Sequence, residues 1–76
     1  MEVNVYVLPH CSVCKMTKEF LKTNKISFIE YDVSKDRQAA NAMIEKSGQQ
    51  QVPVVDVDGT LVIGFEKDKL EELLGL

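Results

Sequence analysis

The hydrophobic residues of this chain change their spacing from one segment to the next, and these changes predict alternating strands and helices. In residues 1–8 they run almost without interruption, which is typical of a central strand covered on both faces. In residues 13–23 they recur at helical spacing with lysines between them, which predicts an amphipathic helix ending near Thr23 and Asn24. The inner side of this helix is expected to hold Val13, Met16, Phe20 and Leu21.

Residues 26–33 form a second apolar segment, which is predicted to be a strand. A strand–helix–strand order favours a right-handed parallel crossover, so the strands at 1–8 and 26–33 are expected to be parallel neighbours. Ser34 is the expected N-cap of a helix over about 35–47, and Gly48 is its expected end. The inner face of this helix is expected to hold Ala39, Ala40, Met43 and Ile44.

The last third of the chain predicts a hairpin followed by a helix. Two short apolar runs, 52–57 and 60–63, flank Asp58-Gly59, which is a strong signal for a two-residue turn between antiparallel strands. Gly64 is expected to end the hairpin, and residues 66–74 predict a helix with acidic residues near its start. Its inward side is expected to hold Leu70, Leu73 and Leu74. The predicted order is βαβαββα, an α/β arrangement.

Length and charge narrow the class of protein. The 76 residues favour one domain over 1–76 with an economical core, and 45% hydrophobic with 28% charged residues is ordinary for a soluble globular protein. A net charge of -3 argues against nucleic acid or a membrane surface as partner. The first residues carry no basic leader or long apolar segment, so a cytoplasmic location is expected.

Cys11 and Cys14 are the two cysteines of the chain, and they lie where the first strand gives way to the first helix. Unpaired N–H groups and the helix dipole at such a position favour a thiolate, so Cys11 is the predicted nucleophile. Cys14, one turn later, should be more buried and able to close a small disulfide with Cys11. Because disulfides in the cytosol are rarely structural, the pair is predicted to be a catalytic redox couple.

Several neighbours of this pair have alternative interpretations. His10 could move a proton, influence the ionisation of Cys11 or contact a partner, and is equally compatible with a loop histidine that has no task. Lys15 and Lys18 could stabilise a thiolate or meet an acidic substrate group; a solvated helix face is the favoured interpretation for Lys18. No acidic residue follows Glu2 in the first strand, so no carboxylate is evident to take the proton of Cys14. The residues interpreted as core are Met16, Phe20, Phe28 and Tyr31. Phe65 is equally compatible with a place in the core and with a contact surface for substrate.

Three stretches of the sequence carry a resemblance that spans the chain: Cys11-Ser12-Val13-Cys14, Gln51-Val52-Pro53, and the Asp58-Gly59 hairpin followed by Gly64-Phe65-Glu66-Lys67-Asp68. With the order βαβαββα, they resemble the thioredoxin fold in its minimal glutaredoxin form. The resemblance implies a four-stranded mixed sheet with helices on both faces and a thiol-disulfide oxidoreductase whose catalytic residues are Cys11 and Cys14. It also implies a monomer with no bound cofactor that reduces disulfides of client proteins or mixed disulfides with glutathione.

In this family the proline that matches Pro53 follows a cis peptide bond and lies against the sulfurs. The backbone of Val52 would then be exposed beside the disulfide, where an extended substrate could pair with it like an added strand. The residues expected at substrate are His10, Val13, Lys15, Gln50, Gln51, Val52, Pro53, Gly64, Phe65 and Asp68.

The resemblance leaves two electron donors open. Glutathione is the family default, yet Leu8-Pro9-His10 and Ser12-Val13 stand where glutaredoxins usually have a lysine and an aromatic residue. Gln50, the Gln51–Val52 backbone and the start of the last helix could still hold a carboxylate of the tripeptide. Residues 64–70 are more similar to NrdH-type redoxins, which pass electrons from thioredoxin reductase to ribonucleotide reductase.

Two hypotheses of other classes remain. The cysteines, alone or together with His10, could be metal or cluster ligands, but structural zinc needs four ligands and the chain has one histidine and two cysteines. Such a site would need a second chain or external thiols. A purely structural adaptor fits the fold but leaves the placement of both cysteines beside a helix start unexplained.

Overall fold

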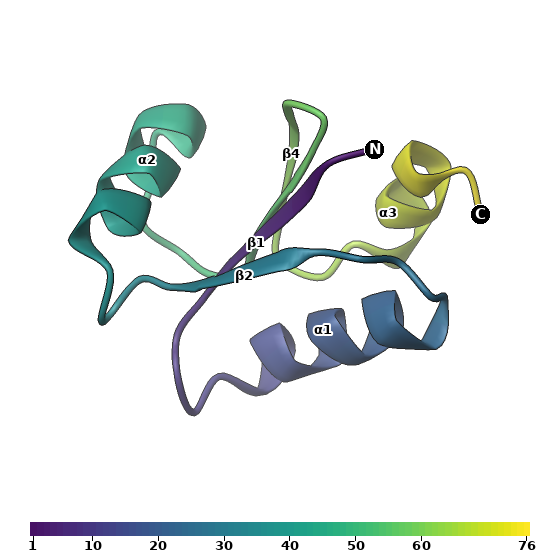
Figure 1. Ribbon diagram of the computed structural model, residues 1–76, viewed down its shortest axis with the longest axis horizontal. Helices are drawn as coiled ribbons and strands as arrows, with labels where there is room; N and C mark the ends of the chain where they lie inside the picture. The colour runs from purple at the N-terminus through teal and green to yellow at the C-terminus, as the bar shows by residue number, and fades with distance from the viewer.

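The computed structural model describes residues 1–76 as one four-stranded sheet with three helices packed against it (Figure 1). The elements in chain order are β1 (Val3–Val7), α1 (Ser12–Thr23), β2 (Ile29–Asp32), α2 (Arg37–Ser47), β3 (Val54–Val57), β4 (Thr60–Ile63) and α3 (Lys67–Leu74). This is the predicted order βαβαββα. None of the helices is long and apolar enough to cross a membrane.

The sheet has the strand order β2-β1-β3-β4, with β1 parallel to β2 and antiparallel to β3, and with β3 antiparallel to β4. The predicted parallel pair and hairpin are thus confirmed. Tyr6 faces Val54 across the β1–β3 pair, and Val54 faces Ile63 across the hairpin. The loop after β1, the segment before β3 and the residues after β4 therefore leave the sheet at the same end.

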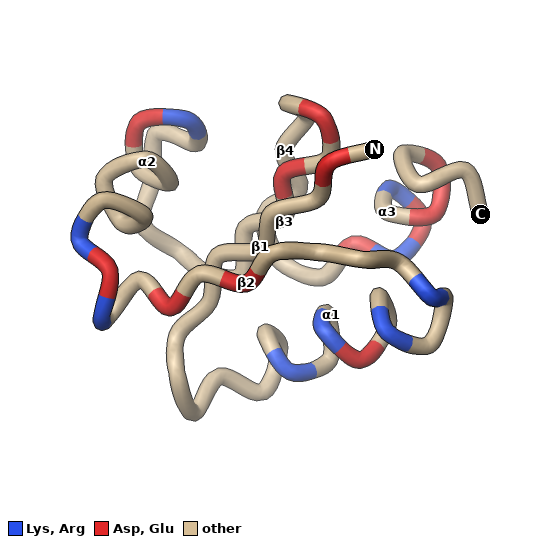
Figure 2. Tube along the Cα trace, in the orientation of Figure 1, with Lys and Arg blue, Asp and Glu red and all other residues tan.

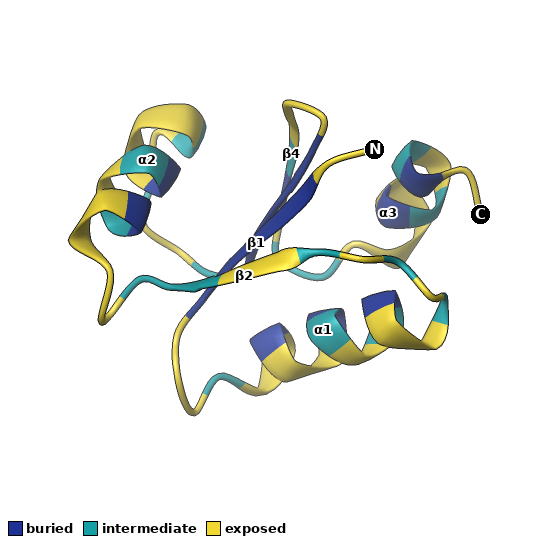
Figure 3. Cartoon of the chain, in the orientation of Figure 1, coloured by how far each residue is buried: buried dark blue, intermediate teal, exposed yellow.

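The two faces of the sheet pack against different helices. Alternation of side chains sends Val3, Val5 and Val7 to one face, where α1 and α3 cover them, and Tyr6 to the other, where α2 packs. Figure 1 shows α2 on the opposite side of the strands from α1 and α3, and Figure 3 shows β1 buried along its length. The prediction of helices on both faces is confirmed.

The inner side of α1 differs from the expected one. Its buried residues are Cys14, Thr17 and Leu21, whereas Val13 is 40% and Met16 52% exposed. Thr17 can be buried because its hydroxyl donates to the carbonyl oxygen of Val13 at 2.8 Å, so no polar group is left without a partner. The helix is therefore turned so that the second cysteine, and not Met16, points into the core; the assignment of Met16 to the core was wrong.

The start of α2 also corrects a prediction. Asp36, and not Ser34, caps this helix by accepting the N–H of Ala39 at 3.0 Å. Ser34 instead donates its N–H and hydroxyl to the carboxylate of Asp32, and these hydrogen bonds lower the pKa of Asp32. Gly48 ends the helix with φ 69°, a left-handed conformation that glycine adopts without steric cost, as predicted.

The inner face of α2 is smaller than expected, because Ala39 and Met43 are buried but Ile44 is 38% exposed. The second strand begins at Ile29 instead of residue 26, because residues 24–28 are used to turn from α1 back to the sheet. The hairpin turn is as predicted: Asp58 and Gly59 have φ of 49° and 95°, the positive values that a tight turn between twisted strands requires.

Candidate active site

Cys11 and Cys14 are joined as a disulfide at the start of α1, with their Cα atoms 5.2 Å apart. Cys14 is 1% exposed and belongs to the core between β1, α1 and α3, while Cys11 is half-buried at the rim of that core. A solvent-borne disulfide can therefore reach the first sulfur and not the second. The predicted division into an accessible and a buried cysteine agrees with this geometry.

Cys11 is the N-cap of α1, and its sulfur accepts the N–H of Cys14 at 3.1 Å. Its carbonyl oxygen accepts the N–H of Lys15 at 3.1 Å, which is the first hydrogen bond of the helix. A serine or aspartate at an N-cap does the same with oxygen. When the disulfide is reduced, the same N–H and the positive end of the helix dipole favour a thiolate at Cys11.

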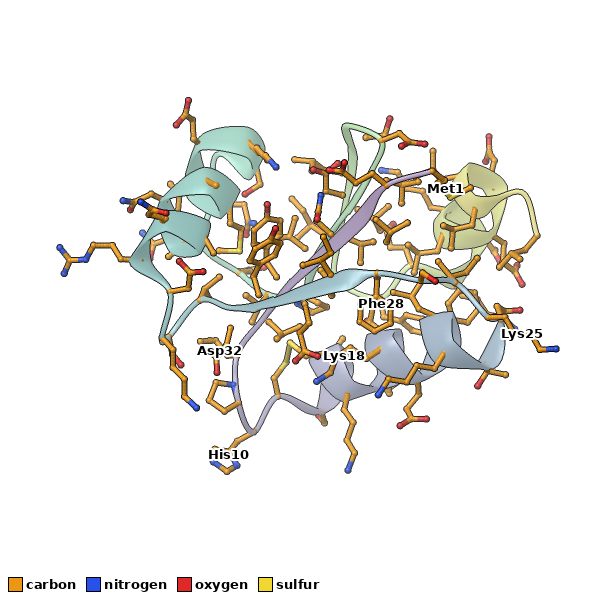
Figure 4. The ribbon with its side chains drawn as sticks, in the orientation of Figure 1. Met1, His10, Lys18, Lys25, Phe28 and Asp32 are labelled. Carbon is orange, nitrogen blue, oxygen red and sulfur yellow. A yellow bond between two sulfur atoms is a disulfide. The ribbon has the colours of Figure 1, made fainter.

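A hollow of about 480 Å³ opens beside the two sulfurs and is lined by Leu8, Pro9, His10, Cys11, Ser12, Cys14, Lys15 and Lys18. Its ionisable lining is basic and includes no carboxylate. Lys15 is exposed, but Lys18 donates to Glu30 on β2 at 2.9 Å, so it is an ion-pair partner of the sheet and not merely a solvated lysine. His10 sits at the tip of the loop with φ 61°, and in Figure 4 its ring points away from the fold.

The segment expected to bind substrate lies at the same end of the sheet. The Val52–Pro53 bond is cis, and Pro53 is fully buried beneath the surface. The carbonyl oxygen of Pro53 accepts the N–H of Gly64 at 2.8 Å, which joins two of the predicted stretches. Gln50 and Gln51 are exposed, and neither the N–H nor the C=O of the half-buried Val52 takes part in a hydrogen bond of the fold.

A second, apolar groove of about 620 Å³ lies along α1 next to Phe65, and Ser12 and Lys15 line both this groove and the hollow at the sulfurs. Its apolar lining consists of Met16, Phe20 and Phe65, of which the two rings meet edge to face with centroids 5.5 Å apart. Phe65 thus packs on the core and lines the surface at once. Met16 and Phe20 were not predicted to line a surface groove, although their spacing of four residues on one helix face was a signal for it.

The remaining sequence candidates do not line the hollow at the sulfurs. Val13 is exposed but lines neither hollow. Asp68 lies in the first turn of α3, in a separate shallow hollow made of residues 66–69. Asp56 is the buried acid of the sheet, but it points to the α2 face and is bound by Lys46 at 3.1 Å, so it is not a proton acceptor for Cys14.

Metal ligands are sparse throughout the molecule. No group of three or more His, Cys, Asp or Glu side chains is close enough to hold a metal ion. A site built on Cys11 and Cys14 would need further ligands from outside the chain.

Comparison with known proteins agrees with this architecture. Residues 3–62 match the family model of glutaredoxin. A glutaredoxin-like 8.6 kDa protein from the rubredoxin operon of Clostridium pasteurianum is 36% identical over 95% of this chain and 96% of its own length. The glutaredoxin-like protein NrdH of Lactococcus lactis is 31% identical over 93% of this chain and 97% of its own.

A solved structure shows the same fold. NrdH-redoxin of Escherichia coli, a glutaredoxin-like protein described as having a thioredoxin-like activity profile, superposes with a TM-score of 0.85 at 27% identity, covering 96% of this chain and 95% of that one. The residues matched by the family model, 3–62, include the two cysteines and the cis proline Pro53. With a thioredoxin-like fold and a family model matched over most of its length, this chain belongs to the glutaredoxin family.

Proposed function

We propose that this protein is a small dithiol thiol-disulfide oxidoreductase that reduces disulfides of client proteins. One observation carries the proposal: the accessible Cys11 sulfur accepts a backbone N–H at the start of α1 while the buried Cys14 sulfur is bonded to it. This arrangement favours a reactive thiolate on one cysteine and a shielded resolving thiol on the other.

Reduction proceeds by two exchange steps. The Cys11 thiolate attacks one sulfur of the client disulfide, a mixed disulfide forms, and the other client sulfur leaves as a thiolate that takes a proton from water. Cys14 then loses its proton to solvent and attacks the Cys11 sulfur, which releases the second client thiol. The client gains two electrons and two protons, and the protein ends in the Cys11–Cys14 disulfide form.

Clients would approach along the Val52–Pro53 segment, where the free N–H and C=O of Val52 suit an extended chain. His10 and Lys15 would line the other side of the reacting sulfurs, where the positive charge of Lys15 favours the departing thiolate. No bound cofactor is needed, because both electrons stay on sulfur. We place this monomeric enzyme in the cytoplasm, where reductants keep such a pair in turnover.

Two electron donors are possible for this enzyme. Two molecules of glutathione could reduce the disulfide, with Gln50, Gln51 and the start of α3 near Asp68 as contacts for the tripeptide. The apolar groove at Met16 and Phe65 shares Ser12 and Lys15 with the hollow at the sulfurs. It favours a protein donor such as thioredoxin reductase, and a ribonucleotide reductase is then the matching client. This is the NrdH-type alternative, and the groove is the observation that supports it.

The test is a pair of coupled assays with the purified protein and a disulfide substrate, followed as NADPH consumption. One assay contains glutathione and glutathione reductase, and the other contains thioredoxin reductase. Turnover in the first alone assigns glutathione, and turnover in the second alone assigns the NrdH-type route. The proposal would be refuted if neither assay showed turnover and the reduced protein also failed to reduce the substrate disulfide stoichiometrically. The hypothesis that the cysteines are metal ligands would then be favoured.

A further inference from the structure

The chain just before Val52 is held by the side chain of Gln49, a residue that the chemistry above does not use. Its Oε1 accepts the N–H of Gln51 at 2.7 Å, and its Nε2 donates to the carbonyl oxygen of Gln51 at 3.2 Å. An N–H needs an acceptor and a C=O needs a donor, so the orientation of the amide is determined by its partners. One side chain therefore pairs with both backbone groups of Gln51, as a neighbouring strand would.

Gln49 is itself anchored to the end of α2. Its Nε2 also donates to the hydroxyl oxygen of Ser47 at 3.1 Å, and this hydroxyl donates to the carbonyl oxygen of Met43 at 2.6 Å. Met43 is 2% exposed and packs on the sheet. The amide of Gln49 is thus fixed relative to the core and is not a freely rotating surface group.

The other end of the substrate segment is held as well. Proline has no N–H, and the carbonyl oxygen of Pro53 is bound by Gly64 at 2.8 Å. With the groups of Gln51 paired to Gln49, the N–H and C=O of Val52 are the one complete donor–acceptor pair left free between residues 51 and 53. An extended chain can dock there in a single register.

We propose that Gln49 is a positioning residue that holds Gln51 extended, so that client backbone pairs with Val52 alone and its disulfide arrives at Cys11 in one register. This inference rests on the proposed function and adds the element that sets its client geometry. Loss of the amide would leave the Gln51 groups free to compete for the client and would loosen the segment. Clients that use backbone pairing would suffer, while small disulfides that have no backbone would not.

The test compares two substrates across matched variants. The substrates are a peptide disulfide with extended flanks and bis(2-hydroxyethyl) disulfide, which has no peptide backbone. Gln49→Met keeps the length of the side chain and removes its hydrogen bonds, and Gln49→Glu keeps an acceptor for Gln51 but loses the donor. Gln38→Met is the matched control, because it makes the same change at an exposed glutamine of α2 whose side chain makes no hydrogen bond.

We expect Gln49→Met to lower kcat/KM for the peptide by about five- to tenfold, mainly through KM, since the two hydrogen bonds that hold the Gln51 backbone are lost. Turnover of the small disulfide should stay within about twofold, Gln49→Glu should be intermediate on the peptide, and Gln38→Met should match the wild type on both substrates. Hydrogen exchange gives a readout without activity: the Gln51 amide should be protected in the wild type and in Gln49→Glu, and unprotected in Gln49→Met.

Equal losses on both substrates would mean general destabilisation and would overturn the positioning role. So would unchanged peptide turnover in Gln49→Met while the wild type reduces both substrates. A wild type that reduces neither substrate would refute the proposed function itself, and the inference with it. If Gln49→Met does not fold, the peptide-selective loss in Gln49→Glu decides between the same outcomes.

Discussion

The two faces of the sheet are built by different means. The face covered by α1 and α3 is a cluster of ten buried residues that are all apolar side chains or the Cys14 sulfur. The face covered by α2 has a buried cluster of four, and beside it Lys46 donates to the Tyr6 hydroxyl and to the Asp56 carboxylate, each at 3.1 Å. The cysteine pair lies at the start of α1, on the apolar face, and the side-chain contacts of Lys46 lie on the α2 face. Figure 2 shows that charged residues occur on both α1 and α2.

This difference has a physical reason. A resolving cysteine has to be shielded from solvent yet close to its partner, so it belongs in a continuous apolar core. α2 is a single helix with few buried residues, Ala39 and Met43, and a polar contact to the sheet adds the attachment that apolar area does not provide. Each face can therefore be perturbed separately, and the effects should differ in kind.

The largest expected effect is on activity and comes from the apolar face. Cys11→Ser should lower turnover by more than about 10³-fold, because the nucleophile is gone, with little change in stability in the reduced state. Cys14→Ser should instead accumulate mixed disulfides that mass spectrometry detects. Equal tolerance of both changes in the coupled assay would contradict the assigned roles.

The next effect concerns stability and compares the two cores directly. Leu21→Ala removes a side chain that is 0% exposed in the larger cluster and should lower the free energy of unfolding by about 3–4 kcal/mol. Met43→Ala, in the smaller cluster, should cost about 2–3 kcal/mol, because a smaller and more open site relaxes around the cavity. Urea unfolding measures both, and a larger loss at Met43 would reverse the ranking of the faces.

Removing the hydrogen bonds of Lys46 to Tyr6 and Asp56, here called the Lys46 tether, should have a smaller effect on the free energy of unfolding. Lys46→Met removes the donor to Asp56 Oδ2 and to the Tyr6 hydroxyl, while Asp56 Oδ1 still accepts the N–H of Gly59. The change should cost about 1–2 kcal/mol at neutral pH, with turnover unchanged. The matched control is Lys18→Met, which breaks a more exposed ion pair with Glu30 and should cost less than about 1 kcal/mol. Equal costs by urea unfolding would mean that the tether is an ordinary surface pair.

The tether also predicts a pH dependence. Hydrogen bonds to Tyr6 and then to Asp56 raise the pKa of Lys46 above its usual value. The native state therefore holds this proton more tightly than the unfolded chain, so the stabilisation is complete below the unfolded pKa of about 10.4 and declines above it. The stability difference between wild type and Lys46→Met should be constant from about pH 6 to 9 and narrow above about pH 10.5. A difference that widens above that pH would contradict the sign.

The smallest structural effect is expected at the rim of the apolar face. Met16 is 52% exposed, so Met16→Ser should change the free energy of unfolding by no more than about 0.5 kcal/mol. If a protein donor docks in the groove, the same change should raise the KM for thioredoxin reductase about threefold and leave a small disulfide unaffected. A loss of unfolding free energy well above that limit would mean that Met16 is part of the core.

Much of this architecture was predictable because local signals and the global fold agree. Gly48 and Asp58-Gly59 were identified by the left-handed conformations that helix ends and tight turns require. The order βαβαββα followed from changes in hydrophobic spacing, and Cys11 was placed at the helix start by its position after the first strand. Such features depend on a few neighbouring residues, so tertiary packing changes them little.

Features that depend on several segments at once were not predictable. The rotation of α1, which buries Thr17 and exposes Met16, depends on which side meets β1 and α3, and helical spacing alone leaves a choice among adjacent stripes. The capping of α2 by Asp36 was decided by competition, because Ser34 is held by Asp32.

The sequence by itself determined the fold class, the element order and the redox pair, since these rest on short-range spacing and on one motif. Tertiary structure alone decided which side chains share the rim of the disulfide, that Lys46 ties α2 to Asp56, and that Gln49 engages Gln51. Those contacts join side chains whose conformations are set by packing and hydrogen-bond competition among separate elements, and no local pattern specifies the outcome of that competition.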